Sequence, residues 1–146
     1  MIIRSAQLED IETLFNIRLS VRENYLSRED LAELGVTPKT VARMLQTTCH
    51  AWIAEIDERA IAFTMANAQE GSIFVIAVMP AFAGRGVGQA LMAIAEEWLR
   101  AQGFDEIWLL TTNDPKLRAY GFYQHLGWTL TEAGSDGLVK FIKRKV

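Results

Sequence analysis

The feature that most constrains this chain is a buried strand that leads through glycines into a helix. Residues 72–79 read SIFVIAVM, an unbroken apolar run that closes at Pro80. A run that is apolar on both faces is typical of a strand in the centre of a sheet. The segment 83–92, AGRGVGQALM, follows with alternating glycines at Gly84, Gly86 and Gly88 and then with apolar residues at helical spacing. The pattern predicts a strand–turn–helix unit in which the glycines leave the backbone of the turn uncovered by side chains.

The glycine turn predicts an anion site over residues 84–89. The first N–H groups of a helix have no partner within it, and glycines let an anion approach them closely. Arg85 adds a positive charge at the same place. The alternative is a tight turn that needs glycine for its geometry alone, which fits one glycine better than three. Neither nucleotide motif is complete: Gln89 and Ala90 stand where a P-loop has lysine and a hydroxyl, and Gln89 replaces the third glycine of a dinucleotide fingerprint.

Periodicity along the rest of the chain predicts a single α/β domain over residues 1–146. Two-residue alternation indicates strands, and apolar residues three or four apart indicate helices. The order is β-α-α-β-β-β-α-β-α-β-β, which makes a mixed sheet with about four helices on its faces. The expected strands are 1–7, 50–56, 60–68, 72–79, 104–112, 127–132 and 138–145, and the expected helices are 8–24, one beginning after Thr37, 86–102 and 114–126. The segment 25–36 is interpreted as irregular or partly helical.

Composition narrows the classes of function. The chain has 146 residues and a net charge of −3, which gives no general attraction to nucleic acid. The basic end KFIKRKV is interpreted as the solvated end of an edge strand, whose lysines hinder pairing with the sheet of another molecule. No segment approaches the roughly 18 apolar residues of a membrane span, and the opening turns acidic too early for a secretory signal. A single cysteine, Cys49, forms no internal disulfide, so we expect a cytoplasmic protein with no membrane or nucleic-acid partner. No His, Cys, Asp or Glu residues have the spacing of metal ligands, so no metal is expected.

Two motifs make the chain resemble the GNAT superfamily of acyl-CoA N-acetyltransferases. That family shows V-x-P-x-x-R-G-x-G-I-G-x-x-L between its fourth strand and third helix, and N…A…FY-x-x-x-G-[FW] further on. This sequence carries in register Val78, Pro80, Gly84, Gly86, Val87, Gly88 and Leu91, followed by Asn113, Ala119, Phe122, Tyr123, Gly127 and Trp128. The order of elements matches as well. The resemblance implies a GNAT-like domain whose mostly antiparallel sheet is splayed between its fourth and fifth strands.

The resemblance implies acetyl-CoA as the acetyl donor. Its pyrophosphate would lie on the turn formed by Gly84, Arg85, Gly86, Val87, Gly88 and Gln89. Its pantetheine arm would run along Ile76, Ala77 and Val78 like an added strand. Asn113 would bond the pantetheine amide or cap the following helix. One position departs from the family pattern, because Ala83 replaces the Gln or Arg that contacts phosphate. Arg85 or the backbone amides would then supply that contact.

The reaction implied is direct attack of a primary amine on the thioester. A backbone N–H near Val78 would stabilise the thioester oxygen as it gains charge. Tyr123 would protonate the departing sulfur, since a tyrosine pKa of about 10 is close to the thiol value of about 8.5. The alternative for Tyr123 is core packing, and Tyr120 is either its rival or part of the pantetheine path. The base stays open among Glu70, Glu23, Glu55 and water, because Leu110 stands where one branch of the family has a glutamate.

The acceptor is expected to be a small-molecule amine or a peptide amine. In the resemblance, the loop after the first helix helps to form the substrate wall, and here Arg22, Glu23, Asn24 and Tyr25 would line it. The alternative is a charged surface loop. A second hypothesis is a non-catalytic acyl-CoA-binding sensor or subunit, motivated by Ala83 and by the missing base. The protein is expected as a monomer or as a homodimer paired through its C-terminal edge strand.

Overall fold

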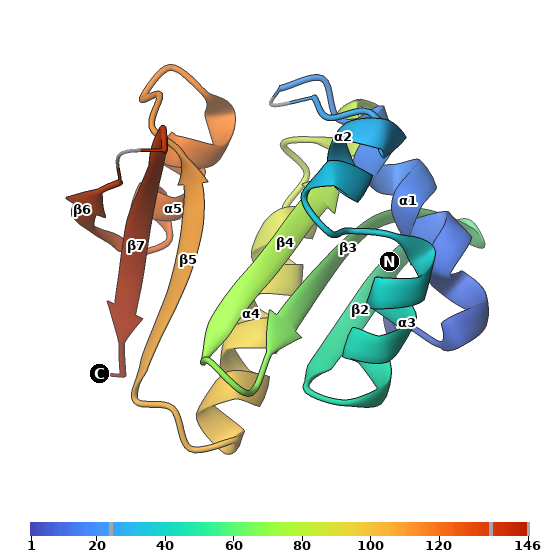
Figure 1. Ribbon diagram of the computed structural model, residues 1–146, viewed down its shortest axis with the longest axis horizontal. Helices are drawn as coiled ribbons and strands as arrows, with labels where there is room; N and C mark the ends of the chain where they lie inside the picture. Colours follow the sequence, from blue (N-terminus) through green and yellow to red (C-terminus); the bar gives the residue numbers. More distant parts are fainter. Residues whose placement is uncertain (24, 135, 146) are drawn as a thin grey trace.

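All seven expected strands form one sheet in the order β1-β2-β3-β4-β5-β7-β6 (Figure 1). The computed structural model describes residues 1–23, 25–134 and 136–145. Every neighbouring pair of strands is antiparallel except β4 and β5, which are parallel. The strands are β1 (Ile2–Ser5), β2 (Cys49–Ile56), β3 (Arg59–Asn67), β4 (Ser72–Val78), β5 (Glu106–Thr112), β6 (Thr129–Ala133) and β7 (Leu138–Arg144). The predicted mixed, mostly antiparallel sheet is therefore confirmed.

Five α-helices are described, one more than expected. They are α1 (Ile11–Ser20), α2 (Arg28–Glu33), α3 (Pro38–Gln46), α4 (Val87–Ala101) and α5 (Arg118–His125). The additional helix is α2, in the segment interpreted as irregular or partly helical. Ser27 starts it by accepting the Asp30 N–H at 3.0 Å, while the Asp30 carboxylate accepts the Ser27 N–H at 2.9 Å. This reciprocal cap satisfies two backbone donors and stabilises a short helix.

Two expected helices are shorter than predicted. Helix α1 ends at Ser20 instead of residue 24, and a single turn of 3₁₀ helix, Leu8–Asp10, precedes it. Helix α5 begins at Arg118 instead of residue 114. The Asp114 side chain accepts the N–H of Lys116 and the Asp114 carbonyl accepts the N–H of Leu117, both at 3.0 Å. Aspartate commonly competes with a helix in this way by bonding the backbone two residues ahead.

The helices divide the core into two buried clusters, one on each face of the sheet. Helix α4 covers one face, where Leu91, Ala95 and Leu99 pack with β2, β3 and β5. Helices α1 and α3 cover the other face, where Phe15 and Ile17 pack with Ile53 and other residues. Figure 1 shows α1 to α3 over the half of the sheet that holds β2 to β4, with no helix in front of β5 and β7. In the described part of the chain, no helix is long and apolar enough to cross a membrane.

The sheet opens between β4 and β5, as the resemblance implied. The two strands pair at one position only, Ser72 with Trp108. Strand β4 also carries a bulge, since Met65 pairs with Val75 and Ala66 with Ile73, which leaves Phe74 as an extra residue. The buried Thr64 hydroxyl donates to the Val75 carbonyl at 2.9 Å beside this bulge. A bulge bends its strand and increases the local twist, so β4 turns away from β5 beyond their single point of pairing.

Candidate active site

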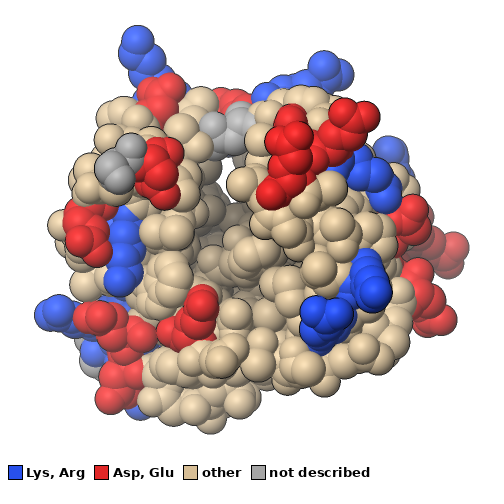
Figure 2. Space-filling view, in the orientation of Figure 1, with Lys and Arg blue, Asp and Glu red and all other residues tan. Residues whose placement is uncertain are grey.

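The candidate site is the cleft that widens between β4 and β5. At its closed end, the Trp108 N–H donates to the Gly71 carbonyl and the Trp108 indole N–H donates to the Glu70 carbonyl, both at 3.1 Å. Beyond this point the two strands diverge. Figure 2 shows the resulting hollow through the middle of the molecule, with walls in this view formed mainly by residues that carry no charge. The cleft is therefore closed at the Trp108 end and open at the C-terminal end of β4.

The edge of β4 that faces the cleft offers free backbone groups. The Met79 N–H donates to the Ile61 carbonyl at 2.9 Å, so Met79 points its backbone toward β3. In an antiparallel pair the backbone groups of successive residues point alternately toward and away from the partner strand. Ile76 and Val78 therefore direct their N–H and C=O groups into the cleft. Ala77 does not, because its backbone faces Phe63 of β3 and its side chain is buried in the core, so of the three residues expected along the pantetheine arm it is the one that offers no free backbone group.

The glycine turn lies directly after β4, at the start of α4. Gly84 and Gly86 have φ of +78° and +82°, a left-handed conformation that glycine adopts without strain. Gly86 caps α4, whose first internal hydrogen bond runs from the Ala90 N–H to the Gly86 carbonyl at 3.1 Å. The N–H groups of Val87, Gly88 and Gln89 precede that bond and have no helical partner. A Cβ atom at Gly84 or Gly86 would have no neighbour within 4 Å, so the turn leaves open space for an anion.

Gly88 has a different physical role. A Cβ atom at this position would lie 3.2 Å from Cζ of Phe122 and 3.7 Å from Cγ2 of Val78. Gly88 therefore lets α5 approach the first turn of α4 closely, next to the cleft edge of β4. The purely geometric alternative applies to this glycine, while the open positions of Gly84 and Gly86 fit a phosphate group. Arg85 is exposed, and its guanidinium lies 5.3 Å from the ring centre of Phe82.

Tyr120 and Tyr123 of α5 are both 7% exposed and pack in the cluster beneath α4. Tyr123 contacts Phe141 and Trp128, with ring centres 5.9 and 6.4 Å apart, and Tyr120 meets Phe141 edge-on at 5.2 Å. Burial raises the pKa of Tyr123 above its ordinary value, because the phenolate would lose its hydration. The Tyr123 hydroxyl thus keeps its proton through the physiological range, and the ring packing weighed as its alternative role is also present.

Asn113 lies in the loop after β5 and does not cap the next helix. Its N–H donates to the Gly137 carbonyl at 2.9 Å, whereas the N-cap of α5 is Leu117, which has no capping side chain. The prediction of a capping role for Asn113 is wrong, because α5 starts further along the chain. The exposed Asn113 side chain leaves the proposed contact with a pantetheine amide available.

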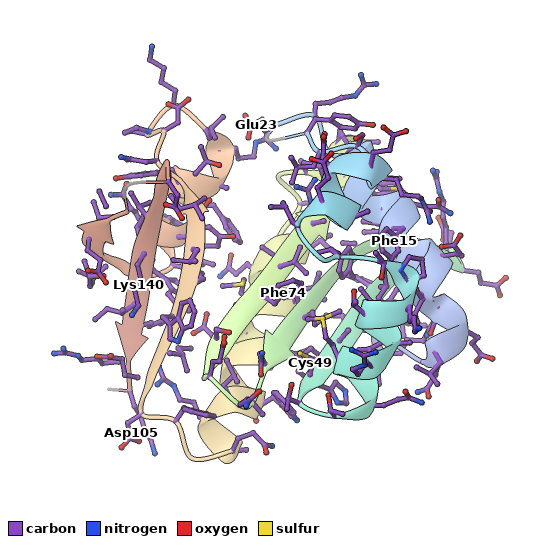
Figure 3. The ribbon with its side chains drawn as sticks, viewed as in Figure 1. Phe15, Glu23, Cys49, Phe74, Asp105 and Lys140 are labelled. Atoms are coloured by element: carbon purple, nitrogen blue, oxygen red, sulfur yellow. The ribbon has the colours of Figure 1, made fainter. Side chains whose placement is uncertain are left out.

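The cap of α5 comes from Glu23, which is 95 residues away in the sequence. Its carboxylate accepts the Arg118 N–H, the first of α5, at 3.1 Å. Figure 3 shows Glu23 at the upper end of the opening, between the loop after α1 and α5. Arg22 and Tyr25 of the same loop are exposed. Asn24, the fourth residue expected in the substrate wall, lies outside the described residues. No local signal in the sequence connects Glu23 with α5.

The comparisons with known proteins agree with this geometry. Residues 9–128 match the acetyltransferase (GNAT) family. The chain belongs to the GNAT family. Its members use acetyl-CoA as the acetyl donor. The chain is also 40% identical over 63 residues to a mycothiol acetyltransferase of Beutenbergia cavernae, a match that covers 43% of this chain and only 21% of that protein.

Solved structures resemble this GNAT chain over almost its whole length. PaiA N-acetyltransferase of Thermoplasma acidophilum, solved in complex with coenzyme A, superposes with a TM-score of 0.84 at 18% identity and covers 98% of each chain. A ribosomal-protein-alanine N-acetyltransferase of Brucella melitensis gives a TM-score of 0.75 at 16% identity and covers 99% of each chain. At these identities the likeness supports the fold alone. The acceptor of this GNAT protein therefore has to be inferred from the residues of its own cleft.

The three carboxylates considered as general bases occupy different places in this GNAT chain. Glu55 lies on β2, two strands away from β4, and pairs with Arg4 at 3.4 Å, so it is not at the cleft. Glu70 lies at the closed end, where its carboxylate accepts the Ser72 hydroxyl at 3.3 Å. Glu23 lies at the open end as the cap of α5. Of the three, only Glu70 and Glu23 are close to the cleft, and each already has a hydrogen-bond donor.

Cys49 and His50 do not form a nucleophile pair. The Cys49 side chain is buried in the cluster beneath α1 and α3, and burial raises its pKa. His50 points to the other face, where its Nε2 lies 2.9 Å from the Ser5 hydroxyl and its ring lies against Trp52 and Trp98. Adjacent residues of a strand point to opposite faces, so the two side chains do not meet. In the described ranges, no group of three or more His, Cys, Asp and Glu side chains is arranged to hold a metal ion.

Proposed function

We propose that this protein transfers an acetyl group from acetyl-CoA to a primary amine of a small molecule or peptide. The proposal rests on one observation: the cleft edge of β4 and the glycine turn at the start of α4 are continuous. The cleft edge of β4 presents the unpaired backbone of Ile76 and Val78, and it leads directly into the glycine turn with the unpaired N–H groups of α4. A chain that pairs like a strand and ends in a pyrophosphate fits this combination.

We assign the binding roles by the positions of the residues. The N–H groups of Val87, Gly88 and Gln89, with the flanking Gly84 and Gly86, hold the pyrophosphate. Arg85 supplies the positive charge that Ala83 cannot. The backbone of Val78 and Ile76 bonds the pantetheine arm, and the Asn113 side chain bonds one of its amides. Tyr120 packs beside this path.

A small number of groups in this chain are assigned chemical roles. When bound, acetyl-CoA supplies the thioester that the amine attacks. A cleft-facing N–H of β4, at Val78 or one pleat further at Ile76, stabilises the thioester oxygen as it gains charge. The Tyr123 hydroxyl holds the proton that the departing sulfur needs. Water carries the amine proton away, with Glu70 and Glu23 as the carboxylates at the two ends of the cleft.

Calorimetric titration of the purified protein with acetyl-CoA, beside ATP and NAD, tests the cofactor. We expect saturable binding of acetyl-CoA alone, followed by release of free thiol in the presence of an amine. Binding of ATP or NAD in its place, or of none of the three, would overturn the proposal.

A second candidate is a non-catalytic acyl-CoA-binding sensor or subunit. It is favoured by Ala83 and by the engagement of Glu23, Glu55 and Glu70 in other contacts. This reading predicts acetyl-CoA binding without thiol release for every amine in a broad panel, so the same two measurements separate it from the enzyme.

A further inference from the structure

We infer that the acceptor carries an apolar group next to its amine, and that Phe74 and Leu110 form the subsite for this group. The inference rests on the proposed acetyl transfer and extends it to the class of acceptor. Phe74 and Leu110 are large hydrophobic residues that remain 44% and 50% exposed. Neither belongs to a buried cluster.

The two side chains flank the cleft on the same face of the sheet. Ser72 pairs with Trp108, so Phe74 and Leu110 each follow this pair by two residues, at the point where the strands begin to diverge. Their predecessors, Ile73 and Leu109, are buried in the cluster beneath α4. Alternation along β5 therefore directs Leu110 to the opposite face. At the bulge, Phe74 and Val75 together oppose Met65, and Met65 and Val75 pack in the cluster on that opposite face. Figure 3 shows Phe74 beside the opening on this face, and Figure 1 shows no helix covering β5 there.

The position of Phe74 relates this pair to the reacting atoms. Phe74 is two residues from Ile76, which is about 7 Å along a strand. The pantetheine arm starts at the glycine turn and passes Val78 before Ile76, so its reactive end points toward Phe74. An amine that attacks there places its substituent between Phe74 and Leu110. The bulge contributes directly, because Phe74 is the extra residue that it places at the cleft.

Lys140 and Glu70 lie at the closed end of the cleft, where the Glu70 carboxylate already accepts the Ser72 hydroxyl at 3.3 Å. Lys140 is the cross-strand partner of Leu110, and its ammonium lies 5.1 Å from the ring centre of Trp108 at the closed end of the cleft. A polyamine would bring its distal cation against two apolar side chains and near this lysine. Burying a charge without a partner is costly, so we expect the subsite to select monoamines with alkyl or aryl groups.

A matched pair of amines tests this selection. Hexylamine and 1,6-diaminohexane have the same reactive end and differ only in the distal ammonium. Thiol release should show kcat/KM at least about tenfold higher for hexylamine, since the diamine buries an unpaired charge. Across butylamine, pentylamine and hexylamine, kcat/KM should rise about fourfold per methylene. Equal or reversed preference between hexylamine and its diamine would overturn the inference.

Variants assign the effect to the two side chains. Phe74→Ala and Leu110→Ala should each lower kcat/KM for hexylamine on the order of tenfold, with the Kd for acetyl-CoA unchanged. Leu130→Ala removes another exposed leucine, 42% exposed on the outer strand β6, and should change neither value. Leu110→Glu should reverse the selection, because a carboxylate there pairs with the distal ammonium of the diamine. Unchanged selection in all three cleft variants would contradict the inference.

Binding measurements distinguish failure of this inference from failure of the proposed function. Protein saturated with coenzyme A is titrated with hexylamine and with the diamine by calorimetry. Binding of coenzyme A without preferential binding or turnover of hexylamine would overturn the apolar subsite and leave the cofactor proposal in place. Absence of coenzyme A and acetyl-CoA binding would overturn the proposed function itself.

Discussion

The two halves of the sheet differ in how they are covered. Strands β1 to β4 have α4 on one face and α1 to α3 on the other, whereas β5, β7 and β6 have helical cover on one face only (Figure 1). The covered half holds the β4 edge proposed to bind the cofactor, at Ile76 and Val78, in a register set by β3 and by the bulge. The half-covered part leaves Leu110 and Lys140 facing solvent beside the cleft. Packing on both faces thus supports the proposed cofactor edge, while the proposed acceptor subsite lies where one face of the sheet is open.

The largest expected effect concerns the glycine turn of the covered half. Gly86→Asp adds a carboxylate where the pyrophosphate is proposed to lie. We expect acetyl-CoA affinity to fall at least about 100-fold, because like charges brought together cost several kcal/mol. Calorimetric titration measures the change.

Gly35→Asp is the matched control for this variant. Gly35 also has a left-handed φ, +84°, and open space around it, but it follows α2. Both variants carry the same backbone strain, so an equal loss of affinity in the two proteins would locate the phosphate site elsewhere.

The next largest effect concerns α5, which packs across the cleft from β4. Tyr123→Phe should lower kcat about 100-fold, since a positioned general acid contributes on this order. The Kd for acetyl-CoA should stay the same, because the ring contacts with Phe141 and Trp128 remain. Tyr120→Phe serves as the control and should keep most of the turnover. If Tyr123→Phe retained full turnover while Tyr120→Phe lost it, the acid would be Tyr120.

Alkaline unfolding provides a third test through the same side chain. Below about pH 10, Tyr123 is protonated in both the folded and the unfolded chain and contributes no pH dependence. Above that pH the unfolded chain releases the proton, while burial raises the pKa of Tyr123 and the folded protein keeps it. Stability should therefore fall with rising pH, by about 1.4 kcal/mol per pH unit from this group.

Urea unfolding of the parent protein and of Tyr123→Phe isolates the contribution of Tyr123. The free energy of unfolding is compared between about pH 9 and 11, the range in which tyrosine titrates. The variant should lose stability less steeply. Identical slopes would indicate that Tyr123 ionises as easily in the folded protein as in the unfolded chain.

The smallest effect concerns the contact that joins the two halves at the open end of the cleft. Glu23→Ala removes the acceptor for the Arg118 N–H and should destabilise α5 by about 1 kcal/mol, as the loss of a helix cap does. Glu23→Gln keeps an acceptor oxygen and should retain most of this stability. Hydrogen exchange of the Arg118 amide reports the difference, and equal protection in both variants would contradict the capping role.

The sequence predicted local features well because their causes are local. The apolar run 72–79, the glycines after it and the helical spacing beyond it were sufficient to predict the strand–turn–helix unit. The start of α5 was predicted less well, since Asp114 delays the helix through its own bonds with the backbone. The sequence also did not distinguish the roles of the three glycines. Only the close packing of Phe122 against Gly88 shows that this glycine differs from Gly84 and Gly86.

By itself, the sequence determined the order of the strands and of four of the helices, the glycine turn at the end of a central strand and the tyrosine-bearing helix. These depend on periodicity and turn chemistry within a few residues. The tertiary structure decided which backbone groups are free, since pairing with β3 turns Ala77 away from the cleft and Ile76 and Val78 toward it. It also brought Glu23 to α5 and set Phe74 opposite Leu110. Such contacts join residues far apart in the chain, so register, bulge position and packing decide them, and no local pattern records them.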